Sequence, residues 1–326
     1  MYQKRIIWCM ITSFLVIMCL FGLYPISSTE THEGSVLAEL EADADPITRI
    51  LVLGADRSVG LTDSMFILTL NEQTKEASVL QIPRDTYAEY TDHDYKKING
   101  ASNALGNSGL TAFLSDAMQV KLHAYIKLDL DVLAHLVDDI GGVDVEVPQE
   151  MNYSDPAQGL EIQLPRGKVH LDGRTAEHFV RYRAGYADAD LGRLDAQKLF
   201  LRAVAQKCKS LRLSQVLKAA FSALPHVNTN LSLPDAIRVL TVLMDCDADA
   251  FPMATLAGQA VKGNSGAWYY SLNRQGAVRM INDYLLPKTQ ITCDQFDPNG
   301  IFDREGHRDF HAIYEAMETE LPLPIV

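Results

Sequence analysis

The sequence predicts an α/β domain, in which helices pack on a β-sheet, behind one hydrophobic helix at the N-terminus. Beyond residue 48, short apolar runs rich in β-branched residues alternate with longer stretches that have helical periodicity. The first residues form instead a long apolar run without charge. Interleaved strands and helices are most simply arranged as layers, with the helices covering the sheet.

The apolar run at 6–26 contains no charged residue and is long enough, as a helix, to cross a bilayer. Bulky residues follow where a cleaved signal peptide would have small ones, which favours an uncleaved anchor. Lys4 and Arg5 precede the run and an acidic stretch follows it, so the positive-inside rule places the rest of the chain outside the cytoplasm. The predicted division is a cytoplasmic N-terminus at 1–5, a transmembrane anchor at 6–26, an extracellular linker at 27–47, one domain at 48–290 and a C-terminal tail at 291–326.

Composition restricts the possible partners. The net charge is −13 with a pI near 5.1, which argues against nucleic-acid binding through release of counter-ions. Three cysteines lie outside the predicted anchor, at 208, 246 and 293, and their spacing is not that of a metal site. Cys246 and Cys293 could pair in an oxidising exterior, or remain as buried free thiols.

The order of elements follows from the apolar patterns. Asp172 could cap a helix that runs to Arg181. Strands are expected at 49–53, 64–70, 77–82, 122–128 and 143–147, and helices at 109–119, 131–140, 172–181 and 190–210. The remainder up to residue 287 is expected to be helical with short loops. Nothing in the pattern marks a second domain after the predicted anchor.

Charged groups gather where apolar segments end, which is where ligand sites collect in α/β folds. Asp56 follows the first strand and Asp63 precedes the second. If the two strands are neighbours, the two carboxylates can converge and, with water and phosphate oxygens, would suit Mg²⁺. The alternative is that Asp56 is a turn residue and Asp63 a cap.

Two further cationic stretches lie nearby in sequence. Arg84 follows Pro83, at which the third strand should end, and could clamp a phosphate or pair with Asp85 or another acid. Lys97 lies in a loop with Lys96, where a lysine is commonly just solvated.

The fourth stretch carries the most information. Asp190, Arg193 and Gln197 have the spacing of one helix face and would project together. Arg181 and Arg183 would diverge on a continuous helix, so they reach one site only if the helix ends near Tyr182. The arginines, the lysine and the glutamine together form an anion site suited to phosphoryl transfer by positioning and charge neutralisation.

At these residues the sequence resembles the LytR-CpsA-Psr family, over roughly 48–287. The resemblance rests on eight short motifs that occur in the family's order. They are Leu51–Asp56, Thr62–Met65, Ile82–Thr86, Lys97–Asn99, Gly141–Val145, Leu171–Gly173, Arg181–Arg183, and Asp190–Arg193 with Gln197.

The resemblance implies a single three-layer domain, with a central mixed β-sheet flanked by helices and a hydrophobic pocket for a polyprenyl chain. It implies transfer of a phosphoryl-glycan, such as a wall teichoic acid or capsule, from an undecaprenyl-pyrophosphate carrier to peptidoglycan at the membrane. Asp56 and Asp63 would hold Mg²⁺, or Mn²⁺ in its place. The pyrophosphate contacts would be Arg84, Lys97, Arg181, Arg183, Arg193 and Gln197. Arg84, Asp190 and Arg193 would be catalytic, with Asp190 orienting the arginines or assisting as a base.

The chain departs from the family's pattern at two positions. Leu61 and Ala196 stand where the family often has arginine, and Arg57 could supply charge from the same loop as Leu61. Two other functions remain open: a pyrophosphatase acting on polyprenyl pyrophosphate, and a non-catalytic regulator that binds polyprenyl phosphate. The former would release phosphate without an acceptor, and the latter would keep its lipid binding when metal affinity is lost.

Overall fold

The computed structural model divides the chain into two compact units, Met1–Gly34 and Ser35–Val326. The residues described are 46–55, 61–90, 97–156, 159–186, 189–248, 251–263, 266–285, 290–293 and 295–296, all of which belong to the second unit. The predicted anchor at 6–26 and the acidic stretch after it lie outside them. Among the described helices, none combines the length and the apolar character needed to span a membrane.

A six-stranded mixed sheet forms the centre of the second unit, in the order β10-β3-β2-β1-β4-β9. Its strands, in sequence order, are β1 (Ile47–Ala55), β2 (Thr62–Asn71), β3 (Glu76–Gln81), β4 (Ala124–Asp129), β9 (Asn228–Thr229) and β10 (Met253–Thr255). β1 pairs antiparallel with β2 and parallel with β4, and β10 is parallel to β3. The central mixed sheet is therefore confirmed.

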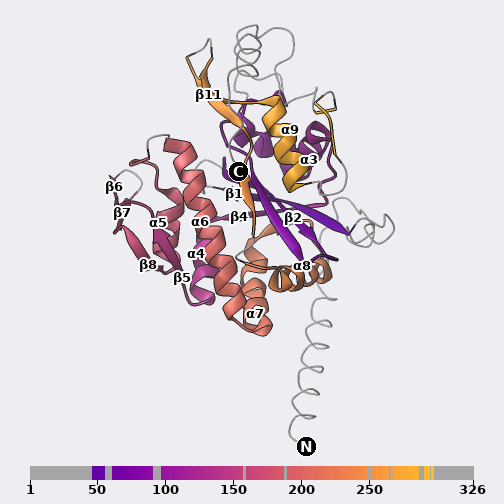
Figure 1. Ribbon diagram of the computed structural model, residues 1–326. Helices are drawn as coiled ribbons and strands as arrows, with labels where there is room; N and C mark the ends of the chain where they lie inside the picture. Colours follow the sequence, from indigo (N-terminus) through magenta and orange to yellow (C-terminus); the bar gives the residue numbers. More distant parts are fainter. Residues whose placement is uncertain are drawn as a thin grey trace, which may run out of the picture. The chain divides into compact units, whose positions relative to one another are not determined.

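Helices cover both faces of this sheet (Figure 1). They are α3 (Ala101–Met118), α4 (Leu130–Asp139), α5 (Gly173–Arg181), α6 (Ala189–Ser210), α7 (Leu213–Ala223), α8 (Leu233–Asp245) and α9 (Arg274–Tyr284), with 3-10 turns η1 (Ile98–Gly100) and η2 (Leu224–His226). Three two-stranded sheets complete the fold: β5 (Val143–Val147) with β8 (Gly167–Leu171), β6 (Met151–Asp155) with β7 (Leu160–Leu164), and β11 (Gly258–Lys262) with β12 (Trp268–Leu272).

The strand alternation creates two cores. Leu51, Leu53 and Ile67 face α3 and α9 in one fully buried cluster. Ile50 and Val52 face the other way, in a cluster that includes residues of α6 and α8. Because successive side chains of a strand point to opposite faces, an apolar run with no polar interruption predicts a strand covered on both sides. The three layers follow directly from this.

A third cluster joins α4, α5 and α6 to the small sheets of β5 to β8. β5 alternates buried Val143, Val145 and Val147 with exposed acids, so one of its faces packs on α6 while the other meets solvent. This cluster holds α5 and the start of α6 beside the central sheet, where the charged residues lie.

Besides β6, β7, β8 and β9, which were not predicted, two stretches differ from the prediction. The segment 253–272 was expected to be helical but contains β10, β11 and β12. These strands have three to five residues, too short for a periodic pattern, and β10 is fixed by pairing with distant Val79 and Leu80. Helix α3 begins at Ala101 rather than 109, with Gly106 (φ 72°) at a kink inside it that hides the periodicity.

The three described cysteines are free thiols, so Cys246 and Cys293 do not pair. Burial raises the pKa of the Cys208 and Cys246 thiols, which keeps them protonated and weakly reactive at neutral pH. Ile291 and Phe296 belong to the core against α3 and α9. The packed structure therefore includes the start of the expected C-terminal tail.

Asp172 caps α5 as expected, because its side chain accepts a hydrogen bond from the Thr175 amide at 2.8 Å. Asp172→Ala should lower the free energy of unfolding by about 1 kcal/mol at pH 7. The bonds from Thr175 hold the pKa of Asp172 below its usual value. This stabilisation is therefore present above the unfolded-state pKa and is lost as the pH falls through the lowered one. Urea denaturation at pH 7 and near pH 3 should show the difference between wild type and variant shrinking at the lower pH, whereas an equal difference at both would contradict the cap.

Candidate functional site

A cavity of about 400 Å³ lies between the central sheet and the cluster of α4, α5 and α6. Its walls are mostly apolar, and its polar residues come from β2, the end of β4 (Asp129), the end of α5 and the start of α6. The apolar lining includes Val52, Phe66, Leu128, Leu130, Leu133, Tyr153, Leu160, Val180, Phe200 and Leu201. The polar lining includes Asp63, Ser64, Arg181, Arg183, Arg193 and Gln197. One cavity thus joins an apolar space to a cationic one.

From the sequence, the Asp56 and Asp63 carboxylates were expected to converge only if the first two strands are neighbours. Asp63 lies at the start of β2, and β2 pairs with β1, so the strands are neighbours. Arg84 Nη1 donates to Asp63 Oδ1 at 2.5 Å. The Asp63 side chain retains 35% exposure and lines the cavity. Asp56 and Arg57 lie outside the described residues.

Asp190 is the centre of the cationic cluster. Its Oδ1 lies 3.0 Å from Arg183 Nη2, 3.1 Å from Arg193 Nη2 and 3.3 Å from Arg84 Nε. Three guanidinium groups from three segments of the chain therefore converge on one carboxylate oxygen. Because like charges at such distances repel, the carboxylate is what permits them to lie together.

The guanidinium of Arg193 is almost completely buried, with 4% side-chain exposure. Burial lowers its pKa to about 10, against the attraction of Asp190, so it remains charged at neutral pH. Burial also opposes the charge of Arg84, but Asp190, Asp63 and Asp85 together outweigh it and raise the pKa of Arg84. Both side chains are thus permanent cations.

Two donors in this cluster lack an acceptor among the described residues. The Nε atoms of Arg84 and Arg193 are buried and form no hydrogen bond there, although Arg84 Nε has its ion pair with Asp190. A buried N–H without an acceptor destabilises the fold, so each one calls for an explanation, and at the wall of a cavity a bound ligand can supply the acceptor. Phosphate oxygens are acceptors of the required charge.

The two arginines at the end of α5 reach the cavity because the helix ends between them. α5 stops at Arg181, and Tyr182 has an extended backbone (φ −62°, ψ 135°) that redirects the chain. Arg181 and Arg183 both line the cavity as a result. Arg181 Nη1 donates to Glu177 Oε1 at 2.9 Å, one turn earlier on the same helix.

Gln197 lies on the face of α6 that carries Asp190 and Arg193, as the spacing predicted. Its Oε1 accepts from Ser64 Oγ at 3.1 Å, and Arg193 Nη2 donates to the Asp63 carbonyl at 3.1 Å. The start of α6 is thereby tied to β2 through two hydrogen bonds. Ser64 belongs to the Thr62–Met65 motif, but no role for its side chain was predicted from the sequence.

Lys97 is not among the residues that line the cavity. Its Nζ donates to Asp85 Oδ1 at 2.9 Å, and Asp85 lies 3.9 Å from Arg84 Nε. Lys97 therefore neutralises Asp85 and reaches the cluster indirectly. Ala196 packs in the core beside α5 with 1% exposure, so an arginine side chain would not fit at this position unless its neighbours moved.

The apolar wall from β6 and β7 was missed because these strands were not predicted. The alternation of Leu160, Ile162 and Leu164 with polar residues was the available signal. Tyr153 of β6 is 40% exposed and lines the cavity. Its partner across the hairpin is Ile162.

The mixed sheet, the apolar cavity and the arginine cluster together define an α/β protein whose cavity is apolar in one part and cationic in another. The family model described as the LytR_cpsA_psr family matches residues 26–284. The chain belongs to this family.

The chain is also similar to two individual proteins of known description. It is 26% identical over 216 residues to the polyisoprenyl-teichoic acid–peptidoglycan teichoic acid transferase TagV of Bacillus subtilis (strain 168), covering 65% of this chain and 55% of TagV. It is 28% identical over 244 residues to TagU of Bacillus anthracis (strain CDC 684 / NRRL 3495), which is also named as a polyisoprenyl-teichoic acid–peptidoglycan teichoic acid transferase. The match covers 73% of this chain and 78% of TagU. The chain thus spans little more than half the length of TagV.

Solved structures agree with the fold. The crystal structure of B. subtilis TagV superposes with a TM-score of 0.64 at 22% identity, over 75% of this chain and 99% of that one. A structure of TagT bound to LI-WTA superposes with a TM-score of 0.59 at 25% identity, over 74% of this chain and 92% of that one. The α/β fold with a central mixed sheet is therefore the fold of the family.

Proposed function

We propose that this protein transfers a phosphoryl-glycan from a polyprenyl-pyrophosphate carrier, of the undecaprenyl class, to a hydroxyl of peptidoglycan. The observation that carries the proposal is the buried Nε donor of Arg193 at the cationic end of an otherwise apolar cavity. Such a cavity suits a ligand with a charged head and an apolar chain. The relatives named as teichoic acid transferases support a teichoic acid or a related wall polymer as the glycan.

The residues divide into two groups by what they would contact. The prenyl chain would lie against apolar residues such as Phe66, Leu133 and Phe200. The pyrophosphate would meet the arginines, whose N–H groups stabilise charge that grows in the transition state. The described cluster has five cations (Arg84, Lys97, Arg181, Arg183, Arg193) and four carboxylates (Asp63, Asp85, Glu177, Asp190), so it carries a net charge of +1 before substrate binds.

The transfer is a displacement at phosphorus. An acceptor hydroxyl attacks the phosphorus that carries the glycan, a new P–O bond forms, and the bond to the bridging pyrophosphate oxygen breaks. Polyprenyl phosphate leaves and the hydroxyl proton passes to solvent or to a nearby base. The protein's part is to align the two phosphates and to neutralise their charge, as in other phosphoryl transfers.

We propose Mg²⁺ as the cofactor, held in part by Asp63, a carboxylate that pairs with Arg84 and is 35% exposed at the cavity wall. Asp63 and Asp56 would be its protein ligands, with water and phosphate oxygens completing the shell, which is how Mg²⁺ is usually held. No group of three or more Asp, Glu, His or Cys side chains that could hold an ion occurs among the described residues. The ion would supply charge neutralisation at the pyrophosphate.

The full-length chain with Mg²⁺, an undecaprenyl-pyrophosphate-linked oligosaccharide and peptidoglycan should form a covalent glycan–peptidoglycan conjugate. Mass spectrometry of the digested wall should find the sugar joined through a phosphodiester, and chelation with EDTA should reduce the yield at least about tenfold. Phosphate release without any conjugate would favour a pyrophosphatase instead. Lipid binding with neither product would favour a non-catalytic regulator.

We also propose that the protein acts at the outer face of the cell membrane, held by the anchor at 6–26. The lysine and arginine that precede this run and the acids that follow it support the orientation. A lipid-linked donor and a wall acceptor would both be accessible there. Nucleic acid is not expected as a partner, given the net charge of −13.

A further inference from the structure

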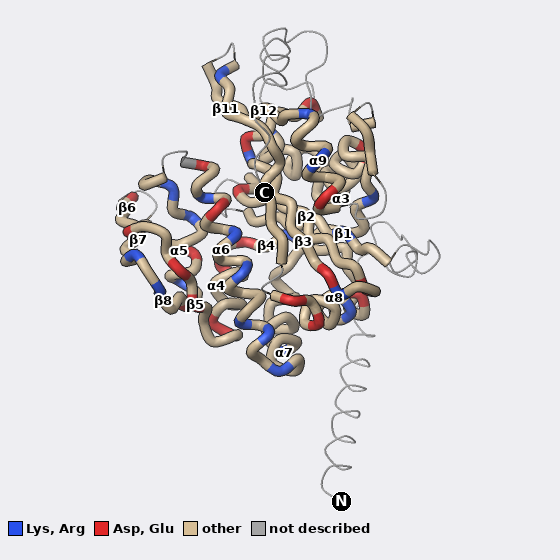
Figure 2. Tube along the Cα trace, viewed as in Figure 1, with Lys and Arg blue, Asp and Glu red and all other residues tan. Residues whose placement is uncertain are grey.

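One part of the chain has a charge pattern that the proposed transfer does not use. Between Asp195 and Asp235 there is no acidic residue, although the whole chain has a net charge of −13. The same stretch contains six cations: Lys198, Arg202, Lys207, Lys209, Arg212 and Lys218. It forms most of α6, all of α7 and η2, and the start of α8. Figure 2 shows the corresponding blue segments around α7.

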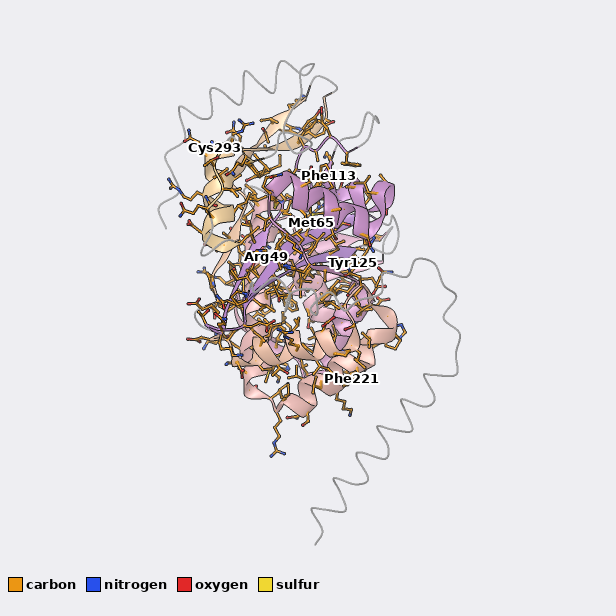
Figure 3. The ribbon with its side chains drawn as sticks, turned by 90° about the vertical axis from the view of Figure 1, so that its right-hand side faces the viewer. Arg49, Met65, Phe113, Tyr125, Phe221 and Cys293 are labelled. Atoms are coloured by element: carbon orange, nitrogen blue, oxygen red, sulfur yellow. The ribbon has the colours of Figure 1, made fainter. Side chains whose placement is uncertain are left out.

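Large apolar side chains are exposed on the same stretch. The described residues include six exposed large hydrophobic residues, at positions 153, 213, 221, 224, 233 and 268, and four of the six lie between 213 and 233. Leu213 and Phe221 belong to α7 and are 38% and 44% exposed, whereas Leu224 and Leu233 are 37% and 44% exposed. Figure 3 shows Phe221 on a helix far from the buried Met65.

The helix itself explains why these side chains face outward. α7 buries Val216, Ala219 and Ala223, which lie on one stripe and pack against the body of the protein. Lys218 and Phe221 lie on the opposite, exposed side, three residues apart. We call the α7 face the exposed residues of α7 and of the segments that flank it, namely Arg212, Leu213, Lys218, Phe221, Leu224 and Leu233.

Of the two acidic residues described near the α7 face, Asp235 is buried and Asp139 is exposed but paired with a serine. Asp235 is 4% exposed, and Ser232 donates to its Oδ2 at 2.6 Å. Asp139 of α4 accepts a hydrogen bond from Ser222, at the border of the face. Lys207 and Lys209 flank the face, where they donate to the carbonyls of Gly141 and Met244.

We propose that the α7 face docks on a bilayer surface that contains anionic lipids. Exposed aromatic and leucine side chains would enter the boundary between headgroups and acyl chains, while the cations meet lipid phosphates. Each lysine or arginine near an anionic surface contributes about 1 kcal/mol of attraction. Charge complementarity alone would also suit a soluble polyanion. The four exposed apolar residues favour the bilayer, since a soluble polyanion gives them nothing to bury against.

The test uses the full-length chain in vesicles, with a single tryptophan as reporter. In a Trp8→Phe and Trp268→Phe background, Phe221→Trp places the reporter on the α7 face. Vesicles of phosphatidylcholine and phosphatidylglycerol with brominated acyl chains quench tryptophans that reach the acyl boundary. Emission should fall about twofold relative to the same lipids without bromine, and should recover in high salt.

A matched reporter is the native Trp268 in a Trp8→Phe background, because it is 59% exposed on β12, outside the α7 face. Its emission should not change. Arg212→Glu with Lys218→Glu should remove the quenching at position 221, whereas Lys168→Glu, an exposed lysine of β8, should leave it intact. Circular dichroism should be the same for all variants.

Two results would overturn the proposal. One is quenching at position 221 no greater than at Trp268, and the other is quenching that persists unchanged after both charge reversals. An emission shift with soluble polyphosphate, in the absence of any quenching by brominated lipids, would assign the α7 face to a polyanion instead.

Discussion

Asp190→Asn should lower kcat/KM for glycan transfer by about 100-fold, equivalent to about 2.7 kcal/mol of transition-state stabilisation. The substitution keeps the size of the side chain and removes its charge. Arg84, Arg183 and Arg193 would then repel one another, because one Asp190 oxygen lies within 3.3 Å of all three. Steady-state transfer assays with the lipid-linked donor should measure the loss.

The same variant separates two roles for Asp190. All of its described contacts are to guanidinium groups, so we assign it to positioning rather than to proton transfer. A positioning role predicts a higher KM for the donor and a pH profile of unchanged shape. A base would instead lose kcat and the acidic limb of that profile.

Asp195→Asn is the matched control, because Asp195 lies on the same helix and pairs with Lys198 at 2.7 Å, outside the cluster. Its activity should stay within about twofold of wild type. An Asp190→Asn protein with unchanged kcat/KM would remove Asp190 from the site. Equal losses in both variants would point to damage to α6 rather than to the arginine cluster.

The sequence predicted the fold best where one local pattern decides the structure. β1 and β2 contain apolar runs that are buried on both faces, and α5 has a capping aspartate and a stripe of buried residues, so each could be identified from its own residues. β10 could not, because its three residues become a strand only by pairing with β3, far away in the chain. Pairing of this kind is decided by tertiary structure, which local propensity does not encode.

For the site residues too, local spacing could be predicted from the sequence and contacts between distant segments could not. The helical spacing of Asp190, Arg193 and Gln197 correctly placed them on one side of α6. Arg181 and Arg183 were expected to reach one site only if the helix ended near Tyr182, and α5 does end there. Nothing in the sequence indicated that one carboxylate oxygen would hold three arginines. That convergence depends on how β3, α5 and α6 meet, and so does the contact between Ser64 and Gln197.

Gly173→Ala should lower the free energy of unfolding by about 3 kcal/mol. A Cβ on Gly173 would lie 2.2 Å from the carbonyl oxygen of Ala134 and 2.7 Å from Asp138 Oδ2. The first of these atoms is backbone of α4 and cannot rotate away. The amide of Gly173 also donates to Asp138 Oδ1 at 2.7 Å, which holds the two helices together.

The consequence should extend to the site, since α5 carries Arg181 at its end and Arg183 just beyond it. Separating α4 from α5 should therefore weaken donor binding even at temperatures where the variant remains folded. Urea denaturation followed by circular dichroism measures the stability, and donor titration measures the second effect. Arg174→Ala, the next position along α5 and an exposed one, should change stability by less than about 0.5 kcal/mol. If the two variants are equally stable, the close approach of α4 to Gly173 does not constrain the fold.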